Sequence, residues 1–275
     1  MAGPRRILVT GSTGNLGQKA VAALKDRDGV EVLRIGRNTG GAPDVVSADL
    51  TAYDTTWASC FQNMHAVLHL AADPRPVATW ASVQRLNLDL TLNVMRAAEA
   101  AQVGRFVFAS SNWVLGGYRF TANRLTSATE PRPVNPYGAS KLFLERCGLA
   151  MAARTGMSFL SLRIGYCQPG ENSPGPHMAF GRWGQEMWLS NQDWAQAVCK
   201  ACLSPYDGSA LLNIMSSNAG MRWDLEEAKS VIGYHPTSQH RPHLPLVARV
   251  RDGAARLRDW LVPPMSPRPL FGSRW

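Results

Sequence analysis

Short apolar runs alternate with amphipathic stretches in the amino-terminal part of the chain. The apolar runs have the length of buried strands, whereas the stretches between them repeat apolar side chains at helical spacing. Candidate strands lie at residues 7–10, 31–35, 45–50, 66–72 and 105–109, and candidate helices at 18–24 and 81–101. Alternation of this kind predicts an α/β fold with a doubly wound parallel sheet.

A glycine-rich turn joins the first candidate strand to the first candidate helix. Its G-x-x-G-x-x-G spacing lets the backbone approach a pyrophosphate, whose charge the amides and dipole of the next helix favour. The alternative is a tight turn without a ligand, but the position at a strand–helix junction favours a Rossmann-type dinucleotide site. We expect the cofactor to contact the residues of this turn: Gly11, Thr13, Gly14, Asn15, Leu16 and Gly17.

The residue after the second candidate strand selects between NAD and NADP in such sites. An NAD-selective site carries Asp or Glu there to bind the ribose 2′-hydroxyl group. Here the chain has Arg37, which can pair with a 2′-phosphate, so the sequence favours NADP over NAD. The alternative is that Arg37 points to solvent and either cofactor is accepted. Further cofactor contacts are expected at Asp49, Leu50, Leu70, Ala71, Ala72, Asn87 and Ile164.

Three polar side chains are candidates for catalysis. Ser111 follows the fifth candidate strand, at the edge where open parallel sheets bind ligands. Tyr137 and Lys141 are four residues apart, so a helix that starts near Pro136 places the phenol and the ammonium group on one face. A nearby cation lowers the pKa of a phenol, so Tyr137 could accept a proton from an alcohol. Alone, a Tyr-x-x-x-Lys pair is more typical of a solvated helix face.

The glycine-rich turn, Ser111 and the Tyr137–Lys141 pair occur in an order that resembles the short-chain dehydrogenase/reductase superfamily, in its extended, sugar-epimerase-like branch. The resemblance covers about residues 5–235. It implies that Tyr137 is the general base or acid, that Lys141 lowers the pKa of this tyrosine and holds the nicotinamide ribose, and that Ser111 orients the substrate.

Four shorter segments resemble a narrower group of enzymes. Residues 108–112, 162–165 and 187–193 are similar to hexuronate dehydrogenases, which oxidise C1 of an aldose with an anionic C6 group, and residues 71–76 to sugar-6-phosphate dehydrogenases. The resemblance implies NAD(P)-dependent oxidation of a small anionic sugar (a uronate, 6-phosphate or 6-sulfonate) to its aldonolactone. It also implies that an arginine binds the anion, and Arg182 is the nearest match. Expected substrate contacts are Asp73, Arg75, Ser111, Asn112, Tyr166 and Arg182.

Two other functions stay open. A sugar or nucleotide-sugar epimerase would use the same three catalytic residues but hold its cofactor tightly, with no net change in redox state. A non-catalytic dinucleotide-binding sensor would keep the glycines without needing Ser111, Tyr137 and Lys141, so their joint presence argues against it.

The domain organisation follows from these segments. We expect a dinucleotide-binding Rossmann core at residues 1–165 and a small substrate-binding region at 166–235, interleaved with the last core elements. Glycines and prolines at 168–184 predict a loop over the substrate. Residues 236–275 are rich in proline and arginine, with one short helix expected at 254–261. We expect this extension to dock on a neighbouring subunit of a homo-oligomer through Trp260, Leu270, Phe271 and Trp275.

Composition and charge indicate whether the protein binds nucleic acid or a metal and where it is located. The net charge of +9 is concentrated after residue 240, but no base-stacking or groove-reading motif accompanies it, so we expect no nucleic-acid partner. The odd count of five cysteines favours free thiols, and Cys199-x-x-Cys202 has no second pair to complete a metal site, so no metal is expected. No apolar run approaches the length of a membrane span and no leader features are present, so we expect a cytoplasmic protein.

Overall fold

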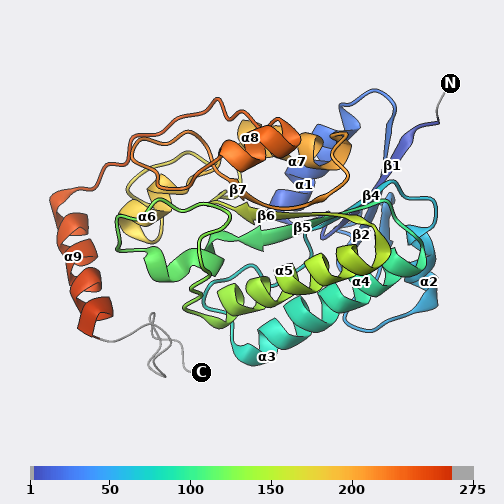
Figure 1. The fold of residues 1–275 in the computed structure, drawn as a ribbon, viewed down its shortest axis with the longest axis horizontal. Helices are drawn as coiled ribbons and strands as arrows, with labels where there is room; N and C mark the ends of the chain where they lie inside the picture. Colours follow the sequence, from blue (N-terminus) through green and yellow to red (C-terminus); the bar gives the residue numbers. More distant parts are fainter. Residues whose placement is uncertain (1–2, 262–275) are drawn as a thin grey trace.

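One sheet of seven parallel strands forms the centre of the molecule. The structure, a computed structural model, describes residues 3–261, and within these the strand order is β3-β2-β1-β4-β5-β6-β7 (Figure 1). The strands are β1 (Arg5–Thr10), β2 (Val30–Gly36), β3 (Val45–Ser47), β4 (Ala66–His69), β5 (Arg105–Ser111), β6 (Ser158–Ile164) and β7 (Ser209–Ile214). The predicted Rossmann-type α/β fold is confirmed.

The strand order reverses direction at β1. This strand pairs with β2 on one side and β4 on the other, and Thr10 at its end aligns with Ile35 and His69. Because all the strands are parallel, their carboxyl ends meet at one edge, where the connections that follow β1 and β4 diverge. Open α/β sheets bind their ligands at such a switch point.

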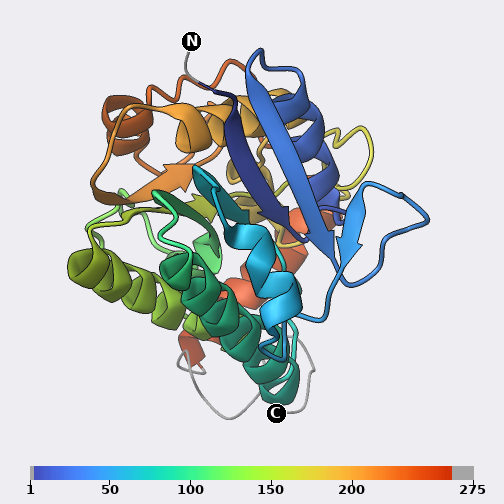
Figure 2. The same ribbon diagram turned by 90° about the vertical axis from the view of Figure 1, so that its right-hand side faces the viewer.

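Helices cover both faces of the sheet (Figures 1 and 2). Ile7 and Val9 of β1 pack into one hydrophobic core, whereas Leu8 between them packs into the other, because successive side chains of a strand point to opposite faces. The first core is covered by α1 (Asn15–Lys25), α7 (Asn191–Leu203) and α8 (Glu226–Ile232), and the second by α2 (Thr55–Ala58), η1 (Ser59–Phe61), α4 (Leu90–Ala100) and α5 (Pro136–Thr155).

The helix expected at 81–101 forms as three consecutive segments. These are α3 (Trp80–Val83), a π-helical segment η2 (Gln84–Asp89) and α4. Leu90 and Val94 of α4 are buried. Leu86, in the π-helical segment, and Leu90 line a cavity that is described below.

The helix α5 begins at Pro136, as the sequence predicts, and ends at Thr155. The side chain of Asn135 accepts a hydrogen bond of 2.7 Å from the amide of Gly138, and Pro136 occupies the first helical turn. Gly156 ends the helix with a φ of 74°, a left-handed conformation that glycine adopts readily. These caps fix the register in which Tyr137 and Lys141 face the sheet edge.

The carboxyl-terminal elements differ in places from the prediction. Residues 168–180 form the expected loop, but a helix, α6 (Gly181–Glu186), begins before its predicted end. The helix α8 starts at Glu226, shortly after the buried Trp223. The helix expected at 254–261 is longer, because α9 (Leu246–Leu261) starts directly after Pro245, a residue that the first turn of a helix tolerates.

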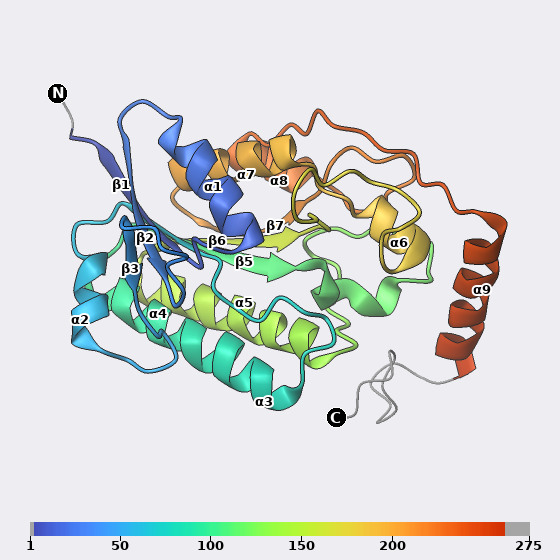
Figure 3. The ribbon, with the colours of Figure 1, turned by 180° about the vertical axis from the view of Figure 1, so that it is seen from behind.

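The segment before α9 is attached to the rest of the fold. The amide of Thr237 donates to Asp193 at 2.8 Å, and the amide of His243 donates to Gln185 at 2.9 Å. α9 lies at the edge of the molecule beyond α6 (Figure 3). Three of the expected docking residues, Leu270, Phe271 and Trp275, lie outside the described residues, as does the side chain of Trp260.

No helix within residues 3–261 combines the length and the apolar character that crossing a bilayer requires.

Candidate active site

A cavity of about 710 Å³ runs along the carboxyl edge of the sheet, from the turn after β1 to the start of α5. Most of the expected site residues line it: Gly11, Thr13, Gly14, Asn15, Leu16, Gly17, Arg37, Asp49, Leu50, Leu70, Ala71, Ala72, Ser111, Asn112, Tyr137, Lys141, Ile164 and Tyr166. Four expected residues are not in its lining, namely Asp73, Arg75, Asn87 and Arg182.

The turn after β1 has the shape that a dinucleotide needs. Gly11 has a φ of 65°, and a Cβ on it would lie only 2.7 Å from the backbone nitrogen of Ala71. Gly14 is the N-cap of α1, so no side chain covers the first amides of this helix. Glycine therefore lets two chain segments meet beneath the cavity, and the open helix end fits the pyrophosphate of a nicotinamide cofactor.

Charged residues lie at the far end of the cavity, beyond β2. Arg37 directly follows β2 and is exposed, and Asp49 lies beside it after β3. Hydrogen bonds from Thr51 lower the pKa of the Asp49 carboxyl group, with smaller contributions from the charges of Arg85 and Arg37. A cation and a carboxylate thus both flank the place where the sequence expects the adenosine ribose.

The three expected catalytic residues meet at the other end. Ser111 ends β5, and its hydroxyl group accepts a hydrogen bond of 3.3 Å from the amide of Trp113. Tyr137 forms a hydrogen bond with Ser111. The ammonium group of Lys141 donates to the carbonyl of Ala109 at 2.7 Å and lies 5.7 Å from the centre of the Tyr137 ring.

Burial shifts the two titratable groups in opposite directions. It raises the pKa of Tyr137 to about 12, which the hydrogen bond from Ser111 opposes and the charge of Asp73 reinforces. It lowers the pKa of Lys141 to about 7, which the charge of Glu145 opposes. Burial therefore acts against the charged form of both groups, and a charge on either of them will change the pKa of the other.

A buried ion pair that was not predicted from the sequence supports this arrangement. Glu145, one helical turn after Lys141, accepts two hydrogen bonds from Arg163 of β6, at 3.0 and 2.9 Å, and one of 2.6 Å from Ser110. All three side chains are buried. These contacts connect α5 to β5 and β6 close to the expected catalytic residues. The Arg163–Glu145 spacing along the chain has no local signature that would have revealed it.

Asn112 lines the cavity, and its side chain is buried with one polar atom unpaired in the described part of the chain. Its Nδ2 donates to the carbonyl of Ile164 at 3.0 Å, whereas its buried Oδ1 has no hydrogen-bond partner among the described residues. Buried acceptors are normally satisfied, so this atom is available to a ligand hydroxyl group. Tyr166, just after β6, contributes an aromatic ring to the same wall.

Asp73, expected to contact the substrate, and Asn87, expected to contact the cofactor, form hydrogen bonds and an ion pair within the protein. Asn87 Oδ1 accepts from the amide of Asp73 at 2.8 Å, and its Nδ2 donates to Ser140 at 3.4 Å. Asn87 thus connects the chain after β4 to α5, outside the cavity lining. Asp73 forms a two-point ion pair with Arg75, at 2.8 and 2.7 Å, so these two charges neutralise each other.

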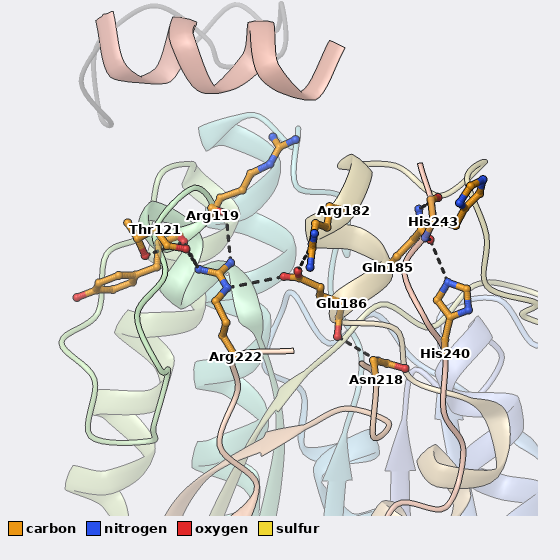
Figure 4. Close-up of polar contacts among 10 residues, drawn as sticks. Arg119, Thr121, Arg182, Gln185, Glu186, Asn218, Arg222, His240 and His243 are labelled. Atoms are coloured by element: carbon orange, nitrogen blue, oxygen red, sulfur yellow. Dashed lines mark hydrogen bonds and ion pairs between the residues drawn. The ribbon is translucent and has the colours of Figure 1, made fainter. Parts of the chain in front are cut away.

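Arg182 also lies away from the cavity. It is in α6 and pairs with Glu186 at 2.7 Å, in a separate hollow that Arg119, Arg222 and Asp252 also line (Figure 4). Arg182 was predicted to bind the anion because it lies shortly before residues 187–193, the segment that resembles hexuronate dehydrogenases. Because α6 starts at Gly181, the side chain turns towards Glu186, one helical turn later, instead of towards Tyr137.

Aromatic and apolar residues that the sequence did not single out complete the catalytic end. They come from the segments after β4, β5 and β6, and they are Pro74, Pro76, Trp113, Pro169, Ala179, Phe180 and Met187. Trp113 directly follows Asn112, so its position was a usable signal. Among the described residues, no cluster of three or more His, Cys, Asp or Glu side chains could hold a metal ion.

Comparisons with known proteins agree with this geometry. Residues 7–167 match the model of the NAD dependent epimerase/dehydratase family. The chain is 34% identical over 247 residues to an L-arabinose 1-dehydrogenase (NAD(P)(+)) of Haloferax volcanii, with 84% of this chain and 96% of that protein covered. It is 32% identical over 250 residues to an NAD-dependent glucose-6-phosphate dehydrogenase of the same organism, with 84% and 92% covered.

A solved structure described as a mutated uronate dehydrogenase has the same fold. The TM-score is 0.74 at 23% identity, and the match covers 97% of this chain and 90% of that one. The cavity at the switch point, the Ser111–Tyr137–Lys141 constellation and the family match together identify the chain as a member of the NAD-dependent epimerase/dehydratase family, the extended branch of the short-chain dehydrogenases/reductases.

Proposed function

We propose that this protein is an NAD(P)-dependent sugar dehydrogenase that oxidises C1 of an aldose to the aldonolactone. The observation that carries this proposal is the placement of Ser111, Tyr137 and Lys141 at one end of a cavity whose other end fits a dinucleotide. The relatives of 34% and 32% identity, both named as sugar dehydrogenases, support the same reaction.

Each residue has a distinct task in this reaction. Tyr137 takes the proton of the C1 hydroxyl group, whose oxygen Ser111 orients through its own hydroxyl group. The ammonium group of Lys141 stabilises the phenolate form of Tyr137. Asn112 Oδ1 accepts a hydrogen bond from a second sugar hydroxyl group. The nicotinamide cofactor, when bound, supplies the hydride acceptor and a further positive charge.

The cavity favours an uncharged aldose over an anionic one. Arg37 and Lys141 are the cations in the described lining; Arg37 lies at the dinucleotide end and Lys141 at the reaction centre. Arg75 and Arg182, expected to bind an anion, are each paired with a carboxylate outside the lining. A desolvated anion without a cation is costly, so a neutral pentose or hexose fits better.

An aldose with an anionic C6 group is the second candidate. The relative named as a glucose-6-phosphate dehydrogenase favours it. To bind the anion of such a substrate, Arg75 would have to leave its ion pair with Asp73, or Arg182 its ion pair with Glu186. Arg75 is the nearer candidate, because Pro74 and Pro76 on either side of it line the cavity.

The test is the absorbance of reduced nicotinamide, with NAD and NADP each offered a panel of sugars. The neutral members are L-arabinose, D-xylose and D-galactose, and the anionic members are glucuronate, galacturonate, glucose 6-phosphate and 6-deoxy-6-sulfoglucose. Reduction with a neutral sugar at a kcat/KM at least tenfold above every anionic one is expected. A preference for an anionic sugar would select the second candidate. Silence across the panel, with cofactor retained through purification, would favour an epimerase.

A further inference from the structure

Phe180 has an unusual backbone conformation at the catalytic end of the cavity. Its φ of 70° and ψ of 14° lie in the left-handed region, although it is a bulky residue, and Gly181 after it has a φ of 60°. A side chain of this size rarely adopts such angles, because its Cβ crowds the backbone. Strained residues persist only where their surroundings hold them, and they occur frequently at functional sites.

The conformation directs the Phe180 ring into the wall of the cavity. The ring meets Trp113 edge to face, with 5.0 Å between the ring centroids and an angle of 78° between the planes. It lies 6.3 Å from the ring of Tyr166, and it packs against the buried cluster that contains Tyr137. Phe180 therefore joins the catalytic tyrosine to the aromatic surface that a sugar would meet.

Two charged residues hold the backbone at this position. Arg119 donates a hydrogen bond of 3.3 Å to the carbonyl of Phe180, and its guanidinium group lies 3.8 Å from the carboxylate of Asp252. Asp252 belongs to α9 and abuts Gly181 so closely that a Cβ there would lie 2.7 Å from its Oδ1. Arg119 points from the core towards α9 (Figure 4). Both side chains are largely buried, with 10% and 12% of their surface exposed.

We propose that Phe180 is a specificity-determining residue that packs on the apolar C–H face of the sugar, and that Arg119 and Asp252 are the positioning residues that hold it there. This inference rests on the proposed dehydrogenase function and identifies what recognises the sugar ring. Aromatic side chains provide a large, rigid apolar surface, which suits an uncharged ring that carries hydroxyl groups on its edge. It also gives the carboxyl-terminal helix a role in the substrate site.

Two variants at position 180 separate the ring from the backbone strain. Phe180→Ala removes the ring and keeps a Cβ in the left-handed region, whereas Phe180→Gly removes both. Both should raise the KM for the sugar at least tenfold and change the KM for the cofactor less than twofold. Phe180→Gly should also unfold about 2–4 °C above Phe180→Ala, because only glycine adopts this conformation freely.

Asp252→Asn tests the positioning role. It should raise the KM for the sugar several-fold with little change in kcat, and it should have no further effect on that KM in the Phe180→Gly background, because both changes act on the same ring. Glu171→Gln, which removes one exposed carboxylate from the loop that ends at Phe180, is the matched control and should leave the KM unchanged.

Three outcomes would overturn the inference. The first is turnover by both Phe180 variants with the sugar KM of the wild type, and the second is equal unfolding temperatures for the two variants. The third is an effect of Asp252→Asn on the KM that is as large in the Phe180→Gly background as alone. Absence of turnover by the wild-type protein itself would instead refute the dehydrogenase function, so the two failures are distinguishable.

Discussion

The ammonium group of Lys141 lies 5.7 Å from the centre of the Tyr137 ring, and both side chains are buried at the start of α5. The carbonyl of Ala109 holds the ammonium group at 2.7 Å, so Lys141 is fixed to β5 as well as to its own helix. Burial raises the pKa of Tyr137 to about 12 and lowers that of Lys141 to about 7. A phenolate at Tyr137 therefore depends on positive charge at Lys141, and we expect catalysis to require both residues.

Replacing Tyr137 with Phe should abolish sugar oxidation while leaving the cavity intact. Only the hydroxyl group that accepts the substrate proton is lost, so kcat should fall at least about 10³-fold, within the range for loss of a general base. The dissociation constant of the cofactor, measured by fluorescence titration, should change less than twofold. Tyr206→Phe, at the opposite end of the sheet before β7, should have wild-type turnover. Normal turnover by Tyr137→Phe would refute its assignment as the base.

Lys141 should make the stability of the protein depend on pH. Its pKa is lowered from 10.5 to about 7 in the folded state, so between these values the unfolded chain binds more protons than the folded one. The contribution of Lys141 to the free energy of unfolding should therefore rise with pH from about 7 to 10, by at most about 1.4 kcal/mol per pH unit. Below pH 7 the ammonium form is present in both states and this contribution is constant.

Urea unfolding at pH 6.5, 8 and 9.5 measures this effect. Lys141→Met removes the titrating group and should flatten the rise, whereas Lys229→Met, at a half-exposed position in α8, should retain it. The raised pKa of Tyr137 opposes the trend only above about pH 10, so it does not enter this window. If the free energy of unfolding rises equally with pH in the wild type and in Lys141→Met, the rise comes from another group.

Local patterns predicted the features that depend on short stretches of chain. The glycines after β1, the helix start near Pro136 and the four-residue spacing of Tyr137 and Lys141 each act within one or two helical turns, so the sequence shows them directly. The apolar runs were sufficient to predict the parallel sheet, because strands that are buried on both faces need apolar residues at nearly every position.

Features that join distant segments were not accessible in this way. The Glu145–Arg163 pair, the Asn87–Ser140 link and the Arg119–Asp252 contact each connect elements that only the folded chain brings together. Arg182 illustrates the same limit. Its place shortly before residues 187–193 predicted a position in the cavity, but in α6 its side chain pairs with Glu186, one helical turn later.

We expect Arg37 to favour NADP over NAD. It is exposed and lines the cavity directly after β2, where the sequence predicts the adenosine ribose. Arg37→Ala should lower kcat/KM for NADP at least about tenfold and change that for NAD less than twofold, because only the phosphate pairs with the guanidinium group. Arg85→Ala, which removes a partner of Asp49 outside the cavity lining, is the control and should affect both cofactors equally. Equal losses in Arg37→Ala would mean that Arg37 does not select the cofactor.

We expect the protein to form a homo-oligomer through its carboxyl-terminal extension. Asp252 of α9 faces the core, whereas the exposed fractions of Leu246, Val250 and Leu257 on this helix are 76%, 66% and 58%. An apolar stripe of this kind is costly to leave in water, so a second subunit is expected to cover it.

Light scattering at micromolar concentration tests this expectation, with a larger mass than the 30.0 kDa chain as the expected result. Leu246→Ser combined with Val250→Ser should shift the mass towards the monomer, because it makes the stripe polar without touching Asp252. Leu92→Ser, at an exposed apolar position on α4, is the matched control and should keep the wild-type mass. A wild-type protein that is monomeric at tens of micromolar would show that α9 does not serve assembly. The proposed role of α9 would then be the contact between its Asp252 and Arg119.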